Sequence, residues 1–220
     1  MALDFSAPGG SPWEDHFASF LVSQMEAGDA AHDRAHVERV VTTARRLART
    51  EDAQMEVVIP AAWLHDCVVV PKDHPRREQA SLLAAEAAGQ FLSEEGYPER
   101  WIAPVKHAIA AHSYSGNIAP ETVEAKVVQD ADRLDALGAV GLARAFMVGG
   151  ALGHTLYDPD DPFCEHRPPD DDTYAIDHFY AKLLRLPDTM QTDAGGTEAE
   201  RRVQFMRTYL DRLADEIDAP

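Results

Sequence analysis

The sequence is poor in cysteine. Cys67 and Cys164 are the only two among 220 residues, and they lie too far apart to form a C-x-x-C pair. This argues against a disulfide framework and against a cysteine-rich zinc site, and it is typical of a reducing compartment. A chain of this length also buries enough surface on folding to be stable without a cross-link.

Long apolar runs are absent as well. No stretch approaches the roughly 18–20 apolar residues that cross a bilayer. The N-terminus lacks the positive charge followed by an apolar segment that marks a signal peptide. We therefore expect a cytoplasmic protein that has no membrane partner.

Basic residues are scarce relative to acidic ones. The chain has 20 Lys and Arg against 38 Asp and Glu, which gives a formal net charge of −18. Such a chain repels nucleic-acid backbones, so we expect no nucleic-acid partner. If the substrate is a phosphate ester, the protein must attract it with local lysines and arginines or with a metal ion.

Strand-like alternation of useful length is also missing, whereas helical periodicity runs through most of the chain. This predicts an all-α fold. The expected helices cover residues 12–27, 32–50, 53–68, 76–95, 98–113 and 120–137, and the first begins with Pro12 after Ser11. Gly138 and Gly141 are expected to loosen the chain after the last of these. Two amphipathic helices follow in the C-terminal part, the first around residues 176–184.

We expect a single domain over residues 1–220. Its core would span about 12–150, and C-terminal helices would span about 173–218. Between them, residues 150–172 contain four prolines and many aspartates, which predicts an irregular loop. Loops of this length are often functional, although a plain surface excursion fits equally well. The last helix carries an apolar stripe that either closes its own domain, which we favour, or forms a dimer seam. A monomer and a homodimer therefore both stay open.

The stretch "WLHDCVVVPKDHP" (63–75) places His65 and Asp66 side by side in an apolar run. Burying a carboxylate is costly unless it is paired or bound to a metal ion. Upstream, His32 and His36 have the i, i+4 spacing that puts two side chains on one helical face. Such a pair can bind a metal together, or one member can cap the helix while the other acts alone.

Three more carboxylates, Asp130, Asp132 and Asp135, follow in an otherwise apolar helix, "VVQDADRLDALGAVGLARAF". They form either a solvated face or part of a site. Two histidines and two carboxylates would make a mixed nitrogen and oxygen ligand set, which suits Mn, Fe, Co or Mg more than a structural zinc. Four protein ligands on an octahedral ion leave two positions for water or substrate.

The order His36, then His65-Asp66, then an aspartate in "DADRLDA" resembles the H…HD…D signature of the HD-domain metal-dependent phosphohydrolase superfamily. The resemblance covers nearly the whole chain. Four segments are similar to one group of bacterial HD-domain proteins of about this length, which includes a nucleotide pyrophosphohydrolase. They are "HDRAHVERV", "AAWLHDCVVVPKDHPRR", "HSYSGNIAPETVEAKVVQDADRLDALGAVGLARAF" and "YAIDHFYAKLLRLPDTMQT".

The resemblance implies an HD-type helical bundle with additional C-terminal helices and one divalent metal ion. The implied ligands are His36, His65, Asp66 and Asp132, the last in "ADRL", with Asp130 as the alternative. Manganese is the expected ion, and Mg, Fe, Co and Ni also suit the site. The implied reaction is attack of a metal-activated water on phosphorus in a nucleotide or similar small phosphate ester, including release of pyrophosphate from a nucleoside triphosphate.

Several further side chains are candidates for contact with the substrate. Asp66 and His112 are candidate catalytic residues, and His112 would serve as a substrate contact or general acid. Lys72 is the cation that we favour for catalysis, because it follows the doublet within a few residues. The candidate phosphate-binding arginines are Arg76, Arg77, Arg133 and Arg144.

Two other functions stay open. Some HD proteins hold two irons and activate oxygen with additional histidines between the doublet and the last aspartate, and His107 and His112 lie in that interval. A non-catalytic binding module that has kept the fold is the third possibility, although the complete ligand set argues against it.

Overall fold

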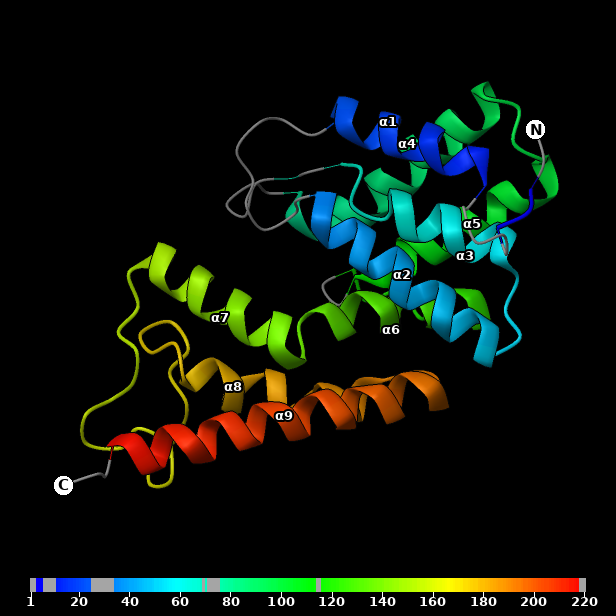
Figure 1. The fold of residues 1–220 in the computed structure, drawn as a ribbon. Coiled ribbons are helices and arrows are strands. Elements are labelled where there is room, and N and C mark those ends of the chain that lie inside the picture. The colour runs from blue at the N-terminus through cyan, green and yellow to red at the C-terminus, as the bar shows by residue number, and fades with distance from the viewer. Residues whose placement is uncertain are drawn as a thin grey trace. The chain divides into compact units, whose positions relative to one another are not determined.

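The computed structural model describes residues 3–5, 11–24, 34–68, 70, 76–113 and 116–217, with only the backbone at Arg77. The described residues form helices and one isolated parallel bridge, between Thr155 and Tyr174, which confirms the all-α class (Figure 1). They gather into two compact units, Met1–Asp132 and Arg133–Pro220. The single domain expected over 1–220 stays a prediction.

The helices follow the predicted order. The first unit contains α1 (Pro12–Gln24), α2 (Arg34–Thr50), α3 (Met55–Leu64), the 3-10 helix η1 (Arg77–Gln79), α4 (Ala80–Glu94) and α5 (Glu99–His112). Helix α6 (Val123–Asp135) carries the chain into the second unit. That unit contains α7 (Gly138–Leu152), α8 (Asp177–Ala181), the 3-10 helix η2 (Leu183–Thr189) and α9 (Asp193–Ile217).

Helix α3 is the centre of the first unit. It packs against α1, α2 and α5, and every residue from Val57 to Leu64 is buried. Pro60 lies inside it and has no N–H, which frees the carbonyl of Glu56 one turn earlier. The buried Tyr97 hydroxyl donates a hydrogen bond to that carbonyl at 2.7 Å. The proline is therefore compatible with a buried helix because a tyrosine supplies the missing donor.

Glu14 of α1 forms hydrogen bonds to both α2 and α3. Its carboxylate accepts hydrogen bonds from Arg45 of α2 at 2.6 and 2.7 Å and from the Trp63 indole of α3 at 3.0 Å. It also accepts the backbone N–H of Ser11, while the Ser11 hydroxyl accepts the N–H of Trp13. This reciprocal pattern is a capping box, and it confirms the predicted helix start at Ser11-Pro12.

The turn between α6 and α7 differs from expectation. The glycines at 138 and 141 were expected to loosen the chain, but α7 begins at Gly138 and continues without a break. Gly138 has a φ of +73°, which favours glycine. A Cβ on Gly141 would lie 2.1 Å from the carbonyl oxygen of Ala136, so only glycine fits there. These residues make a tight turn and do not loosen the helix.

The C-terminal helices are partly as predicted. The amphipathic segment around residues 176–184 is only one short turn, α8, followed by η2, whose Pro187 cannot continue an α-helix. In α9, Val203, Met206 and Leu210 are buried, and the helix packs against α7 and η2. The apolar stripe of the last helix therefore closes its own unit, as we favoured.

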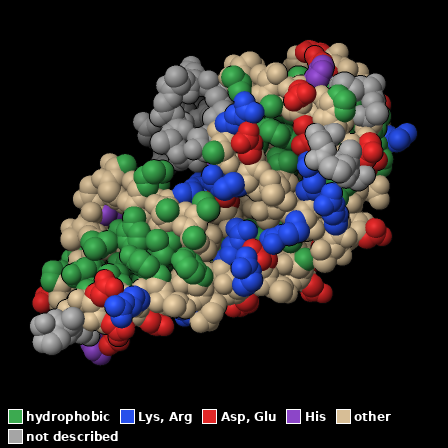
Figure 2. Space-filling view, in the orientation of Figure 1, with side chains coloured by type: hydrophobic (Ala, Val, Ile, Leu, Met, Phe, Trp, Pro, Cys, Tyr) green, Lys and Arg blue, Asp and Glu red, His purple; other side chains and the backbone are tan. Residues whose placement is uncertain are grey.

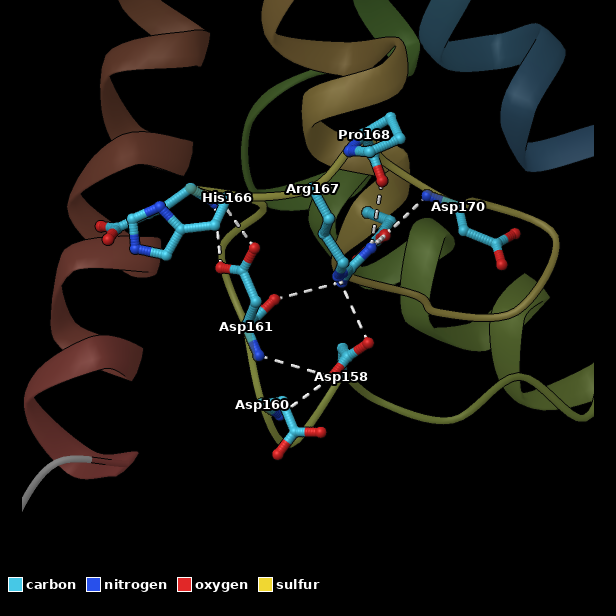
Figure 3. Close-up of polar contacts among 9 residues, drawn as sticks. Asp158, Asp160, Asp161, His166, Arg167, Pro168 and Asp170 are labelled. Atoms are coloured by element: carbon cyan, nitrogen blue, oxygen red, sulfur yellow. Dashed lines mark hydrogen bonds and ion pairs between the residues drawn. The ribbon is translucent and has the colours of Figure 1, made fainter.

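The irregular segment expected over 150–172 begins later, at 153, because α7 continues to Leu152, and it extends to 176, where α8 follows. Arg167 organises this segment (Figure 3). The guanidinium pairs with the buried carboxylate of Asp177, donates to the Asp161 carbonyl at 3.1 Å and lies 3.3 Å from Asp158. It also lies over the Tyr174 ring, 5.0 Å from its centroid. The positive charge of Arg167 therefore orders this segment by contacting the aspartates around it.

Apolar side chains gather on the surface of the second unit (Figure 2). The large exposed apolar residues of that unit are Val140, Met147, Leu152, Leu156 and Phe205. Among the described helices, none is by itself long and apolar enough to cross a membrane, and one bent pair, α6 with α7, meets the length and composition requirements.

The pairing of Asp177 predicts a pH-dependent contribution to stability. Burial opposes ionisation of Asp177, but hydrogen bonds from Arg167 and the Asp170 N–H lower its pKa below the ordinary value. A lowered carboxyl pKa stabilises the fold above the pKa of the unfolded chain, and the contribution disappears as pH falls through the folded pKa. We expect Asp177→Asn to lower the free energy of unfolding by about 1.5–3 kcal/mol near pH 7, the range for a hydrogen bond to a charged group.

This difference should hold down to about pH 5 and shrink below about pH 4. Urea unfolding of wild type and variant across that range measures it. Asp171→Asn is the matched control, because its carboxylate is 43% exposed and pairs only with His178 among the contacts described. A constant difference between wild type and Asp177→Asn down to pH 3 would contradict the assignment.

Candidate metal centre

Four helix ends bring the predicted ligands together. His36 lies in the first turn of α2, and His65 and Asp66 directly follow the last residue of α3. His112 is the last residue of α5, and Asp132 lies in the last turn of α6. All five side chains belong to the first unit, and residues that are far apart in the sequence form one cluster there.

The cluster is tight. The Nε2 atom of His36 lies 3.4 Å from Asp132 Oδ1 and 3.9 Å from Asp66 Oδ2. The Nε2 atom of His65 lies 3.5 Å from Asp66 Oδ2 and 3.8 Å from Asp132 Oδ1. The same oxygen of each carboxylate thus faces both histidines. Both imidazoles are buried, whereas the Asp66 and Asp132 side chains are 23% and 29% exposed, so solvent reaches the carboxylate side.

These distances fit a shared metal ion. Two ligand atoms that are each about 2.1 Å from one ion lie roughly 3.0–3.4 Å apart at bond angles of 90–109°. The separation of 3.4 Å between His36 and Asp132 lies at the upper end of this range, and the other three, at 3.5, 3.8 and 3.9 Å, are somewhat longer. His36, His65 and Asp66 form the one group of three or more metal-ligating side chains found within the described part of the chain.

The tautomer of His65 also fits. Its Nδ1 donates to the Ala62 carbonyl at 2.8 Å, so the lone pair of the neutral ring is on Nε2. That Nε2 atom is fully buried and has no hydrogen-bond partner among the described residues. A buried nitrogen without a partner is unfavourable, and a metal ion is the partner that two adjacent carboxylates would also accept.

The helix ends add to the local field. α3, α5 and the last turn of α6 present their C-terminal ends to the cluster, whereas only α2 presents an N-terminal end. A helix C-terminus carries partial negative charge and favours a cation. The helix C-termini and the carboxylates of the cluster therefore both favour a bound cation.

His112 stands on the other side of Asp66. Its Nδ1 donates to the Ile109 carbonyl at 2.6 Å, and its Nε2 lies 3.6 Å from Asp66 Oδ1. Its ring centroid is 5.0 Å from that of His65. Asp66 thus turns one oxygen toward His36 and His65 and the other toward His112.

Charges in the cluster shift the pKa values of its members in different directions. Burial lowers the pKa of His65 below 6.5, against the raising effect of Asp66. Burial acts in the same way on His112, but its hydrogen bond to Asp66 and the charges of Asp66 and Asp132 outweigh it and raise the pKa. Burial would raise the pKa of Asp132, yet the hydrogen bond from His36 and the charges of the histidines lower it. A neutral His65 and an ionised Asp132 are the forms that bind metals.

Asp130, the alternative for the last ligand, is fully buried in α6. Asp132 faces both histidines, with its Oδ1 3.4 Å from His36 Nε2 and 3.8 Å from His65 Nε2. The choice of Asp132 over Asp130 as the ligand stays a prediction. Cys67, directly after the doublet, is buried with its thiol 3.5 Å from the Ala84 carbonyl, as expected for a packing residue.

The candidate cations are distributed unevenly. Lys72 lies outside the described residues, as does His32. Arg76 is exposed just before η1, and of Arg77 only the backbone is described. In the second unit, Arg133 donates to the Thr189 carbonyl, and Arg144 pairs with Asp135 at 2.5 Å. Those two arginines have contacts within their own unit, and their role in phosphate binding stays a prediction.

His107 behaves differently from His112. Its Nε2 accepts the backbone N–H of Glu121 at 3.1 Å, so this ring holds the start of the segment before α6.

Sequence reasoning missed the two main-chain carbonyls that orient His65 and His112. Both carbonyls come three residues before their histidine, and this i−3 spacing was the available signal.

Comparison with known proteins agrees with this geometry. Residues 34–137 match the HD domain family. Over 207 residues the chain is 37% identical to the YpgQ protein of Bacillus subtilis, with 92% of this chain and 93% of YpgQ covered. The chain belongs to the HD-domain family. All the residues of the cluster lie within the matched segment.

The similarity to solved structures covers nearly the whole of this HD-domain chain. An HD-superfamily hydrolase from Bacillus thuringiensis is 35% identical with a TM-score of 0.74, covering 94% of this chain and 97% of its own. Bacillus subtilis YpgQ in complex with ADP is 35% identical with a TM-score of 0.72, covering 93% and 98%. The similarity therefore includes the C-terminal helices as well as the HD core.

Loss of Asp66 should abolish metal binding. We expect Asp66→Ala to reduce bound divalent metal from about one ion per chain to less than about one tenth, because the remaining oxygen donor is Asp132 alone. Elemental analysis after equilibration with Mn²⁺ measures the ion, and circular dichroism checks that the helices are kept. Asp15→Ala, an exposed carboxylate in α1, is the control. Wild-type metal content in Asp66→Ala would show that the ligand assignment is wrong.

Proposed function

We propose that this HD-domain protein is a metal-dependent phosphohydrolase that acts on a nucleotide or a similar small phosphate ester. The observation that carries the proposal is the convergence of two imidazole nitrogens and two carboxylate oxygens within 3.9 Å across the cluster. The ADP complex of the similar Bacillus subtilis YpgQ supports a nucleotide as the ligand class.

In this proposal His36, His65, Asp66 and Asp132 hold one divalent ion. Mixed nitrogen and oxygen donors suit Mn²⁺, which is our first choice. When bound, such an ion lowers the pKa of a water ligand and draws charge from phosphoryl oxygens. The two carboxylates are the partly exposed members of the set, so the substrate approaches from their side.

His112 is the proposed general acid or substrate contact. Its Nδ1 is held by the Ile109 carbonyl, so its Nε2 is the atom that turns toward the cluster. Because that atom faces Asp66 Oδ1 at 3.6 Å, a proton on it can be stabilised before it moves to a phosphate oxygen. Asp66 in this scheme both binds the ion and orients His112.

Cations must attract the substrate to a chain of net charge −18. Lys72, Arg76 and Arg77 follow the doublet closely in sequence, and Arg76 is exposed at the entry to η1. We propose these three as the phosphate-binding side chains. Arginine suits this role because its planar fork binds two phosphate oxygens together.

The substrate class can be tested directly. We expect the Mn²⁺-loaded protein to hydrolyse at least one member of a panel of nucleoside mono-, di- and triphosphates. Separate assays for orthophosphate and pyrophosphate identify which P–O bond breaks. Asp66→Ala serves as the inactive control. A fully metal-loaded wild type that hydrolyses none of the panel would contradict the proposed function and favour a binding module.

His112 separates the one-ion mechanism from the di-iron alternative. We expect His112→Gln to keep about one metal ion per chain while kcat falls about 100-fold, since general acid catalysis contributes on the order of 10²–10⁴. His107→Gln should leave both quantities unchanged, because His107 bonds to the Glu121 backbone. If either substitution halves the metal content of a protein isolated with two irons, the di-iron function is the better one.

A further inference from the structure

Gln129 is buried between the two helices that flank the cluster. It lies in α6, is 3% exposed, and its amide Nε2 donates to the Ala111 carbonyl of α5 at 2.6 Å. The carbonyls of the last turn of a helix have no donor within that helix. Gln129 therefore supplies a donor from one helix to the open end of another.

The bond reaches both sides of the cluster. Ala111 immediately precedes His112, whose ring faces Asp66. Gln129 itself lies three residues before Asp132, and residues at i and i+3 share a helical face. The bond thus fixes α6 against α5 at the level where Asp132 lies 3.4 Å from His36 and His112 lies 3.6 Å from Asp66.

The amide oxygen of Gln129 argues against a role in stability alone. The Gln129 Oε1 atom is buried and has no hydrogen-bond partner among the described residues. Buried polar atoms are normally satisfied, and one that is not lowers stability. An apolar side chain of equal size would remove this unsatisfied oxygen but would leave the Ala111 carbonyl without its donor, so stability gains little from glutamine here.

We infer that Gln129 is a positioning residue, which acts through Asp132 and His112 and sets the spacing of the metal centre. This inference rests on the proposed metal site. Residues that orient ligands in this way commonly change metal affinity or activity by about 10–100-fold when they are replaced. Gln129 would do so from α6, whereas the main-chain carbonyls that orient His65 and His112 belong to Ala62 of α3 and Ile109 of α5.

The test compares Gln129→Met with Tyr97→Phe in the full-length protein. Each substitution removes one side-chain donor to a helix carbonyl, and Tyr97 bonds to Glu56 without any recorded contact to the cluster. Three quantities are measured: Mn²⁺ affinity by competition with a chelating indicator, kcat and KM at saturating Mn²⁺, and the melting temperature. Both variants should melt within about 2–4 °C of wild type.

We expect Gln129→Met alone to bind Mn²⁺ about 10-fold more weakly, or to lose about 10-fold in kcat with KM changed less than about twofold. Wild-type values for both quantities, or equal losses in Tyr97→Phe, would overturn the inference. Gln129→Leu is the second variant if Gln129→Met does not fold, and failure of both to fold would mark the residue as structural. The Mn²⁺ affinity tests the positioning role of Gln129 even if the wild type hydrolyses no nucleotide. Absence of hydrolysis would contradict only the proposed function.

Discussion

The placement of Asp66 beside buried imidazoles is the constraint on which the rest of this structure depends. A carboxylate at the end of an apolar helix is unfavourable unless cationic or hydrogen-bonding partners surround it. His112 Nε2 lies 3.6 Å from one of its oxygens, and the other oxygen lies 3.5 and 3.9 Å from the Nε2 atoms of His65 and His36, where the proposed metal ion would be the cationic partner. The arrangement holds only if α2, α3 and α5 keep their relative positions, and the Glu14 carboxylate serves that end by bonding to Arg45 of α2 and Trp63 of α3.

Much of the site was predictable because its residues lie where helices begin and end. The apolar run predicts a buried helix over 53–68, and the structure confirms its burial but ends α3 at Leu64, so that His65 and Asp66 follow the helix. The resemblance to HD-domain proteins favoured Asp132 in "ADRL", and the structure brings Asp132 to His36 and His65. Helical spacing alone predicted a mixed set of histidines and carboxylates, and the resemblance selected the individual ligands.

Other features depend on contacts that periodicity does not encode. The segment around residues 176–184 has an amphipathic pattern, yet Pro187 and the packing of η2 on α9 give a 3-10 helix. Gly138 and Gly141 were expected to loosen the chain, but Gly138 is favoured by its positive φ and Gly141 by the close approach of the Ala136 carbonyl. The partners of Gln129, Arg133 and Arg144 are 18, 56 and 9 residues away, and nothing local in the sequence identifies them.

The loop around Arg167 shows a second way in which this acidic chain neutralises clustered aspartates. In the first unit the proposed counter-charge is a metal ion, which can exchange with solvent. In the second unit the counter-charge is a guanidinium, which is attached to the chain and stays protonated. A chelator would therefore remove the counter-charge of the first cluster and leave that of the second in place, so the proposed site makes only the first unit responsive to metal supply.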